Sequence, residues 1–312
     1  MTTPASRARR PTLLIVGCGD VGLRVLRLVA PRWRVLALTS APERCALLRA
    51  HGALPLLGNL DKPATLGRLG GLAEAVLHLA PPLGEGATDL RTRALLAALA
   101  RGGRVRRLVY ASTSGVYGDC AGARFDETRA VRPVTDRARR RVDAEAQVRW
   151  FGRSSGATVS ILRIPGIYAT DRPTGHPRER LLRGTPVLVD EDDVYTNHIH
   201  ADDLARACVA ALVRGAPQRV VHASDDTELK MGDYFDMAAK VCGLPPPPRI
   251  TRAEAAATLG AMQMSFMSES RRLDNRRLKL ELRLKLRYPT VAQGLAQLSA
   301  PSAQSAHSTS LA

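Results

Sequence analysis

Near its start the chain reads Leu13-Leu14-Ile15-Val16-Gly17-Cys18-Gly19-Asp20-Val21-Gly22, and the residues up to Val29 then follow a helical pattern. A short apolar strand that leads through G-x-G-x-x-G into a helix is the order in which proteins hold a dinucleotide. Gly17 would make the tight turn, Gly19 would let the backbone approach a pyrophosphate, and Gly22 would let helix and strand pack closely. The phosphates would accept hydrogen bonds from free N–H groups at the positive end of the helix dipole. The motif therefore predicts a nucleotide site; the alternative is a turn that only requires small residues.

Apolar segments of strand length alternate with helical segments along much of the chain. The expected strands are Thr12–Val16, Arg34–Thr39, Leu54–Leu57, Ala75–Leu79, Arg107–Ala111, Thr158–Ile164 and Arg219–Ala223. The expected helices include Val21–Val29, Pro42–Ala50, Thr88–Ala100, Thr135–Arg153 and Ala201–Arg214. Strands that are apolar throughout and are separated by helices form parallel sheets covered on both faces. With right-handed crossovers, this order predicts an α/β fold with a doubly wound parallel sheet of the Rossmann type.

The pattern loosens after about residue 165, where prolines and glycines interrupt it. We expect a dinucleotide-binding Rossmann domain over 11–165 and a smaller substrate lobe over 166–297. Segments at about 196–224 are expected to return to the main sheet. Residues 1–10 and 298–312 are small and polar without periodicity, so both ends are expected to be disordered.

The composition narrows the class of protein. The chain has no run of 18 apolar residues, so we expect no transmembrane helix, and its N-terminus lacks the apolar segment of a signal peptide. The 5 cysteines are scattered without a C-x-x-C pair. This argues against disulfides and a zinc site, predicts no bound metal, and indicates a cytoplasmic location.

The formal net charge of +17 comes almost entirely from arginine, which is spread along the chain and not gathered in one tract with aromatics. We therefore expect no nucleic-acid partner and no membrane partner. An anionic cofactor or an anionic small-molecule substrate would account for part of this charge. The sequence leaves a homodimer open.

Several later segments resemble one known family. They are Leu108–Gly118 (LVYASTSGVYG), Asp126-Glu127 with Pro133, Leu162–Tyr168 (LRIPGIY), Asn197–Ala205 (NHIHADDLA) and Tyr288-Pro289. Over about residues 12–297 the chain resembles the extended and atypical short-chain dehydrogenase/reductase proteins, the NAD-dependent epimerase/dehydratase group, and within it the YeeZ-like subgroup. The resemblance implies NAD(P) binding and oxidoreductase or epimerase chemistry on a carbonyl or sugar-like substrate.

The resemblance also implies where the cofactor is held. The pyrophosphate would lie on Gly17, Gly19 and Gly22, with Cys18, Asp20 and Val21 between them. Asn59 and Leu60 would face the adenine, Ala80 and Pro81 a ribose, and Pro165 the nicotinamide. The end of the second strand, Leu38-Thr39-Ser40, offers no carboxylate for a ribose 2′-hydroxyl, and Arg44 follows it. Hydroxyls and a guanidinium suit a 2′-phosphate better, so NADP is preferred over NAD; alternatively, Arg44 is a solvated helix residue.

Enzymes of this superfamily use a Tyr-x-x-x-Lys pair and a Ser or Thr at the end of the fifth strand. Thr113 matches the hydroxyl position and is flanked by Ser112 and Ser114. The tyrosine and lysine positions are Arg137 and Arg141, so the pair is missing. Arg141 could still hold the cofactor ribose. Arg137 cannot act as a base, because a guanidinium keeps its proton, but it could stabilise an anion on the substrate. The alternative for this segment is a basic helix face in solvent.

Another group would therefore have to move the proton. Tyr168 and Tyr117 are candidates, as are His198 and His200, although the resemblance favours a structural role for His200 and Asp203. One hypothesis is an NAD(P)-dependent oxidoreductase or epimerase whose catalytic residues are Thr113, Arg137, Arg141 and Tyr168. The other is a non-catalytic NAD(P)-binding redox sensor or scaffold, which the missing Tyr-x-x-x-Lys pair favours.

Overall fold

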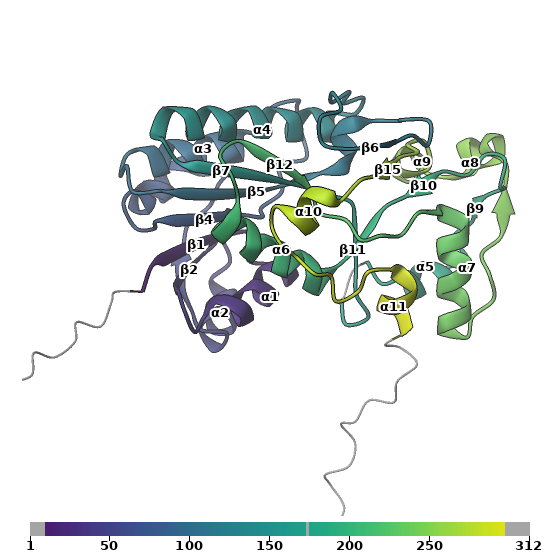
Figure 1. Cartoon of the computed structure of the whole chain (residues 1–312), viewed down its shortest axis with the longest axis horizontal. Coiled ribbons are helices and arrows are strands. Elements are labelled where there is room, and N and C mark those ends of the chain that lie inside the picture. The colour runs from purple at the N-terminus through teal and green to yellow at the C-terminus, as the bar shows by residue number, and fades with distance from the viewer. Residues whose placement is uncertain (1–9, 173–174, 297–312) are drawn as a thin grey trace, which may run out of the picture.

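The computed structural model describes residues 10–172 and 175–296. Apart from Arg10, the residues expected to be disordered at the two ends lie outside this described part. Figure 1 shows a sheet with helices on both faces and a smaller lobe beyond one end of the sheet.

Seven strands form the central sheet, and every neighbouring pair is parallel. Their order is β12-β7-β5-β4-β1-β2-β3. The strands are β1 (Thr12–Val16), β2 (Arg34–Thr39), β3 (Ala53–Leu57), β4 (Ala75–His78), β5 (Arg107–Thr113), β7 (Thr158–Ile164) and β12 (Arg219–His222). These are the seven segments expected from the sequence, so the predicted parallel Rossmann-type sheet is confirmed.

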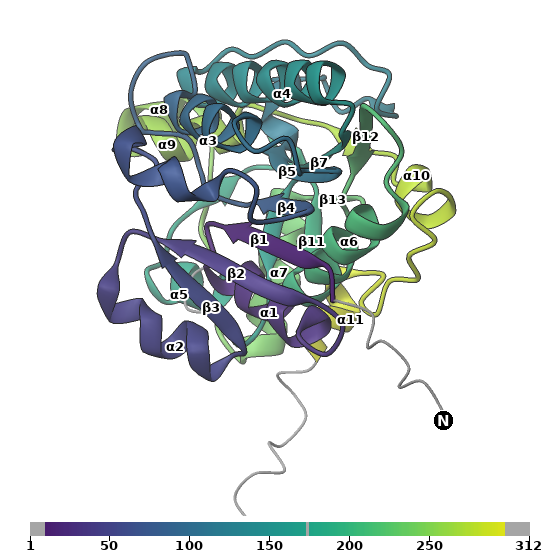
Figure 2. The same ribbon diagram turned by 90° about the vertical axis from the view of Figure 1, so that its left-hand side faces the viewer.

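Two layers of helices cover the sheet, as Figures 1 and 2 show. On one face lie α3 (Leu90–Ala100) and α4 (Asp136–Ser155), which pack together with the 3-10 segment η2 (Pro63–Leu69) over a continuous apolar core. On the other face lie α1 (Asp20–Val29) and α6 (Ala201–Arg214), with α2 (Cys45–Ala50) beside them. Strands such as β1, buried along their whole length, follow from this double covering.

Polar side chains decide where the two helices of the first layer begin. The Asp89 carboxylate accepts the N–H of Thr92, and the Thr135 hydroxyl accepts the N–H of Ala138. Each satisfies one N–H group that the first turn of a helix leaves free. Thus α3 begins at Leu90, two residues later than expected, and α4 begins at Asp136.

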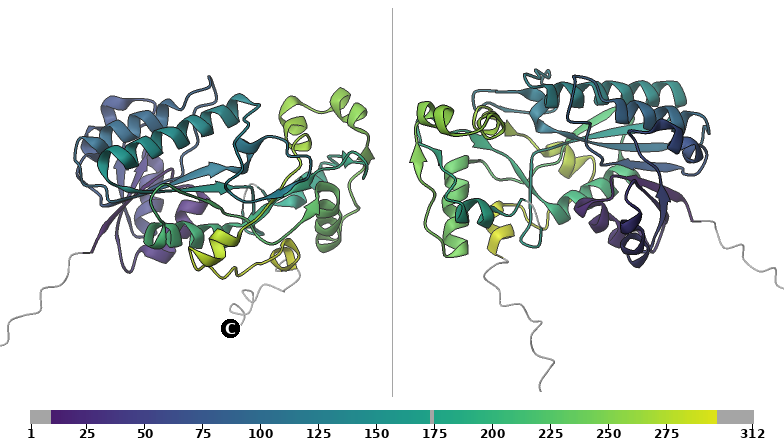
Figure 3. Two further views of the ribbon diagram at one scale, coloured as in Figure 1. Left: turned by 45° about the horizontal axis from the view of Figure 1, so that its top comes forward. Right: turned by 180° about the vertical axis from the view of Figure 1, so that it is seen from behind.

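The smaller lobe has a core of its own, formed by residues between Tyr168 and Leu295. Figure 3 shows this lobe from two further sides. Its helices are α5 (Pro177–Leu182), α7 (Met231–Cys242), α8 (Arg252–Thr258), α9 (Ala261–Met267) and α11 (Val291–Leu295), and its strands are β9 (Val187–Leu188) and β14 (Arg249–Ile250). β15 (Arg272–Leu273) pairs with β6 (Arg124–Phe125) and so ties the later part of the chain to the earlier part. α10 (Arg276–Leu280) packs against β12, and β13 (Leu229–Lys230) is a further short strand of the later part.

The segment at about 196–224 joins the main sheet only in part. β12 pairs with β7 and α6 covers the sheet, as expected. However, β10 (Tyr195–Thr196) pairs with β13, and β11 (His198–His200) pairs with β8 (Gly166–Tyr168), both outside the main sheet. Pro165 separates β7 from β8 because it has no N–H to donate to a neighbouring strand, so the chain leaves the main sheet there.

Candidate functional site

Two cavities adjoin at the carboxyl ends of the parallel strands. The smaller, of about 360 Å³, lies over the ends of β1 and β2, and the larger, of about 730 Å³, lies between the end of β5 and the smaller lobe. Pro81, which follows β4, lines both. The strand order reverses between β1 and β4, which is where doubly wound sheets bind their ligands.

The glycine turn forms one wall of the smaller cavity. Gly17 has a φ of +83°, and a Cβ there would lie 2.4 Å from the backbone nitrogen of Ala80, so no other residue fits. A Cβ on Gly19 would meet nothing within 4 Å, so the turn is open at that point. α1 then begins without a side-chain cap, which leaves its first N–H groups available to an anion. The turn therefore has the shape and the donors that a pyrophosphate needs.

The end of β2 forms a second wall of the same cavity. Arg44 lies across the glycine turn and donates from Nη2 to the backbone oxygen of Cys18 at 2.7 Å. The Thr39 hydroxyl accepts the N–H of Ala41 at 3.2 Å and is engaged in a local turn, whereas Ser40 is exposed. The wall therefore offers a guanidinium and a hydroxyl to a negative group.

The far side of the smaller cavity is formed by the loop after β3 and the loop after β4. Asn59, Leu60, Ala80 and Pro81, which were expected to face the adenine and a ribose, all line it. Asp61 was not expected there, but Arg91 holds its carboxylate with two hydrogen bonds of 2.6 Å and lowers its pKa. Arg91 also donates to the backbone oxygen of Pro81 at 3.1 Å, so it links the two loops.

Five of the expected cofactor residues do not line the smaller cavity. They are Asp20, Val21, Gly22, Arg141 and Pro165, of which Arg141 lines the larger cavity instead. The Asp20 carboxylate accepts hydrogen bonds from Arg24 and forms an ion pair with Arg172 at 2.9 Å. Gly22 was expected to let helix and strand pack closely; a Cβ there would meet the Cys18 side chain at 3.0 Å and the Gly17 backbone oxygen at 3.6 Å, both in the turn. Pro165 lies on the wall of the larger cavity.

The larger cavity brings together three of the four expected catalytic residues, Thr113, Arg137 and Arg141. Thr113 ends β5, as expected, and its hydroxyl accepts the N–H of Gly115 at 3.3 Å. Arg141 donates from Nη1 to the Tyr110 hydroxyl at 3.0 Å and to the Ala111 backbone oxygen at 2.8 Å. These bonds fix the Arg141 guanidinium beside the end of β5.

The fourth expected catalytic residue, Tyr168, is not at the cavity. Its side chain is 1% exposed in the core of the smaller lobe, and its hydroxyl donates to the backbone oxygen of Thr290 at 3.3 Å. Burial raises its pKa well above the ordinary tyrosine value. Tyr168 is the last residue of β8, which pairs with β11 outside the main sheet, and its side chain packs into the lobe core. We therefore do not retain Tyr168 as a proton donor.

Tyr117 is likewise buried and bound within the protein. Its hydroxyl lies 2.6 Å from His222 Nε2 and accepts a 2.6 Å hydrogen bond from Arg163. Arg163 is paired in turn with the buried Glu145, which also accepts the Ser112 hydroxyl at 2.7 Å. Burial raises the pKa of Tyr117 to about 12. This network fixes the core behind β5 and does not face the cavity.

Of the two histidine candidates, only His198 lines the larger cavity. It stacks on Tyr234, and its Nε2 lies 2.8 Å from the Thr196 hydroxyl. Burial lowers its pKa to about 4, so it is neutral near pH 7. His200 caps α6, and the Asp203 carboxylate accepts the N–H groups of Arg287 and Tyr288. These contacts are the structural roles expected for His200 and Asp203.

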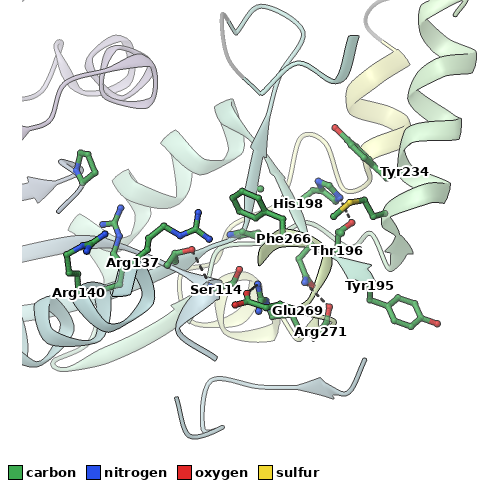
Figure 4. Close-up of a pocket in the computed structure, with 18 of the residues that line it drawn as sticks. Ser114, Arg137, Arg140, Tyr195, Thr196, His198, Tyr234, Phe266, Glu269 and Arg271 are labelled. Carbon is green, nitrogen blue, oxygen red and sulfur yellow. Dashed lines mark hydrogen bonds and ion pairs between the residues drawn. The ribbon is translucent and has the colours of Figure 1, made fainter. Parts of the chain in front are cut away.

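The sequence interpretation missed the residues that the smaller lobe and the chain after α9 add to the larger cavity. Figure 4 shows Phe266, Glu269 and Arg271 in its centre and Tyr234 on the side away from Arg137. Glu269 is 7% exposed and is held by Arg271 at 2.7 Å. Its Oε2 lies 4.0 Å from where a Cβ on Gly115 would stand, and Thr113 Oγ1 lies 3.7 Å from the same point. No motif marks Glu269, because its place depends on the path of the whole chain.

None of the helices in the described part of the chain is long and apolar enough to cross a membrane. Over residues 10–172 and 175–296, no group of three or more potential metal ligands converges.

The fold and the two cavities define an α/β protein with a dinucleotide-type site. The model of the NAD dependent epimerase/dehydratase family matches residues 14–223, so the chain belongs to that family. The chain is 26% identical over 247 residues to 4-hydroxy-2-methyl-3-oxo-4-farnesyl-3,4-dihydroquinoline-1-oxide ketoreductase of Stigmatella aurantiaca, which covers 75% of this chain and 73% of that protein. It is also 26% identical over 144 residues to Protein YeeZ of Escherichia coli, covering 46% of this chain and 49% of that protein. The expected resemblance is therefore confirmed.

Solved structures agree with this placement. A functionally unknown conserved protein from Silicibacter pomeroyi has a TM-score of 0.77 at 31% identity, and the match covers 92% of this chain and 98% of that one. The dTDP-glucose 4,6-dehydratase DesIV of Streptomyces venezuelae, solved with NAD bound, has a TM-score of 0.74 at 21% identity, with 92% and 95% covered. At this lower identity the likeness concerns the fold.

Proposed function

We propose that the chain is an NAD(P)-dependent oxidoreductase or epimerase that acts on a carbonyl or sugar-like compound through a non-standard active site. One observation carries the proposal. The Thr113 hydroxyl and the Glu269 carboxylate flank the same open point in front of Gly115, inside a cavity that adjoins the dinucleotide-type site at Pro81. A hydrogen-bonding hydroxyl and a proton-accepting carboxylate at one point suit a carbonyl or hydroxyl oxygen.

The smaller cavity would hold the dinucleotide. The glycine turn and the N-terminus of α1 would take the pyrophosphate, Asn59 and Leu60 the adenine, and Arg141 the ribose beside the nicotinamide. When bound, the dinucleotide supplies the acceptor or donor of a hydride. We propose NADP over NAD, because Arg44 and Ser40 follow β2 and the end of this strand carries no carboxylate. The carboxylate that does line the cavity, Asp61, lies on the loop after β3 and is held by Arg91.

Three residues of the chain would act on the substrate. Thr113 donates a hydrogen bond to the reacting oxygen, since its hydroxyl proton is free to rotate. Glu269 accepts the proton of the substrate hydroxyl in the oxidising direction and returns it in the reducing direction. Arg137 offers its charge to an anionic part of the substrate. In this proposal Glu269 takes the part of the tyrosine of the missing Tyr-x-x-x-Lys pair, although no sequence motif marks its position.

The carbonyl-reducing activity named for the Stigmatella aurantiaca relative gives the starting point for the assay. Purified chain is incubated with NADPH or NADH and a panel of ketones, quinone-like ketones and keto sugars, and loss of cofactor absorbance is followed. We expect turnover to fall at least a hundredfold in Thr113→Ala, and we expect this variant to retain cofactor binding. Failure of both cofactors to raise the melting temperature would refute the proposal.

A second candidate, a non-catalytic NAD(P)-binding sensor or scaffold, is favoured by one observation. Both positions of the Tyr-x-x-x-Lys pair are arginines, Arg137 and Arg141, and each lines the larger cavity without a tyrosine or lysine in its place. Under this alternative the cofactor binds with the same preference, but no compound of the panel oxidises or reduces it. Arg44→Gln tests the shared cofactor argument, because it should lower the affinity for NADPH more than that for NADH.

A further inference from the structure

The larger cavity has a strongly one-sided charge. Five arginines line it, and Glu269 is the one carboxylate among its described lining residues. Glu269 is already paired with Arg271. The remaining four, Arg137, Arg140, Arg141 and Arg180, take part in no ion pair with a described acidic residue.

Arg140 is the most informative of these. Its side chain is 7% exposed, and the bond found for it runs from Nη1 to the backbone oxygen of Gly86 at 2.5 Å. A guanidinium with so little exposure gains from a negative charge or further hydrogen bonds, because burial penalises the charged form. The Gly86 carbonyl accepts one of its N–H groups, and the other nitrogen atoms are not among the fully buried atoms without a partner, so they remain accessible from the cavity.

Arg137 stands on the same side of α4, three residues earlier. Its guanidinium carbon lies 4.6 Å from the centre of the Phe266 ring. Stacking occupies the flat face of a guanidinium and leaves its N–H edge free for a planar anion. Figure 4 shows Arg137 and Arg140 together on one side of the cavity, away from Tyr234.

The neighbouring Arg139 provides the contrast. It is half exposed, does not line the cavity, and pairs with Asp136 at 2.7 Å. Among the described residues, the solvent-facing Arg139 of α4 thus has an ion-pair partner, whereas Arg137 and Arg140, which face the cavity, have none.

We infer that the ligand of the larger cavity carries a carboxylate or phosphate group that Arg137 and Arg140 bind beside Thr113. The two groups share the chemistry that matters, since both accept paired hydrogen bonds from a guanidinium. The inference deepens the proposed function, on which it rests for the assignment of this cavity to the substrate. It places the anionic group next to the reacting end of the substrate, at the start of α4.

Anion titrations of the full chain test this inference. The chain is first saturated with NADPH or NADH to fill the smaller cavity, and then titrated with inorganic phosphate, pyrophosphate or malonate at constant ionic strength set with sodium chloride. We expect calorimetric binding of at least one of these anions. We expect Arg137→Gln to weaken it at least tenfold, and Arg139→Gln to leave it within twofold. The phosphate and malonate arms show which anion is preferred.

Three outcomes would overturn the inference. They are the absence of binding by all three anions, equal affinity in wild type and Arg137→Gln, and equal weakening by Arg137→Gln and Arg139→Gln. Arg140→Gln should also weaken anion binding. Because Arg140 is buried, this variant could fail to fold, and Arg137→Gln then still decides the test. Should neither dinucleotide bind, the proposed function fails by itself. The anions are then titrated into the free chain with Arg44→Gln as the control for the smaller cavity.

Discussion

The buried pair of Glu145 and Arg163 allows a prediction that depends on no ligand. Glu145 is 1% exposed and receives hydrogen bonds from Arg163 Nε at 3.0 Å, from Arg163 Nη2 at 2.7 Å and from the Ser112 hydroxyl at 2.7 Å. Glu145→Gln keeps the shape of the side chain and removes its charge, so the Arg163 guanidinium remains buried without compensation. Breaking one side of such a pair costs about 3–5 kcal/mol of unfolding free energy.

Urea unfolding followed by circular dichroism measures this loss. The matched control is Asp136→Asn, because Asp136 is 61% exposed and its pairing with Arg139 should contribute below about 1 kcal/mol. The double variant Glu145→Leu with Arg163→Met removes both charges and should recover much of the loss, since well-packed apolar groups often replace a buried pair without penalty. A cost for Glu145→Gln no greater than that for Asp136→Asn, at an unchanged denaturant slope, would refute the reasoning.

Three further predictions follow from single residues. Gly17→Ala should destabilise the fold and abolish dinucleotide binding, because its Cβ would lie 2.4 Å from Ala80 N. Gly19→Ala should fold normally and lose only the cofactor-induced rise in melting temperature, because its Cβ would meet nothing within 4 Å. Equal unfolding free energies for the two variants would contradict this. Glu269→Gln should lower turnover of any panel substrate by about 100-fold or more while NADPH still binds, and unchanged turnover would remove Glu269 from the mechanism. Burial raises the pKa of Asp225 from 3.8 to about 8, so the folded state is favoured below the unfolded pKa and loses stability as pH rises toward 8, by up to about 1.4 kcal/mol per pH unit. Asp225→Asn should therefore gain stability relative to wild type between pH 5 and pH 8 in thermal unfolding, and a gap that stays constant with pH would contradict the assignment.

Much of the sheet and of the smaller cavity could be predicted from the sequence, because the residues that form them are close together along the chain. The glycine turn follows its strand directly, and Arg44 lies one short segment after β2. The spacing of apolar residues and the residues that form turns are local signals, and they predicted all seven strands of the main sheet. The hydroxyl at Thr113 also followed from its position at the end of β5.

The larger cavity could be predicted only in part, because distant segments complete it. Glu269 lies near Gly115 although about half of the chain separates them, and it lies in a stretch without a motif. Tyr168 shows the opposite error: its position beside Pro165 suggested the cavity, but β8 leaves the main sheet and directs the ring into the lobe core. Side-chain direction after a strand break depends on packing that no local pattern encodes.

The division of the larger cavity between distant segments has a consequence for how this protein can change over evolutionary time. The region that matches the family ends at residue 223, and it contains the glycine turn, Thr113 and the arginines of α4. Met231, Tyr234, Phe266 and Glu269 all come later and belong to other walls of the same cavity. Under the proposed function, substitutions after residue 223 can therefore change which compound the larger cavity accepts without changing the glycine turn. Proteins that descend from one ancestor can then differ in substrate while they share the same dinucleotide site.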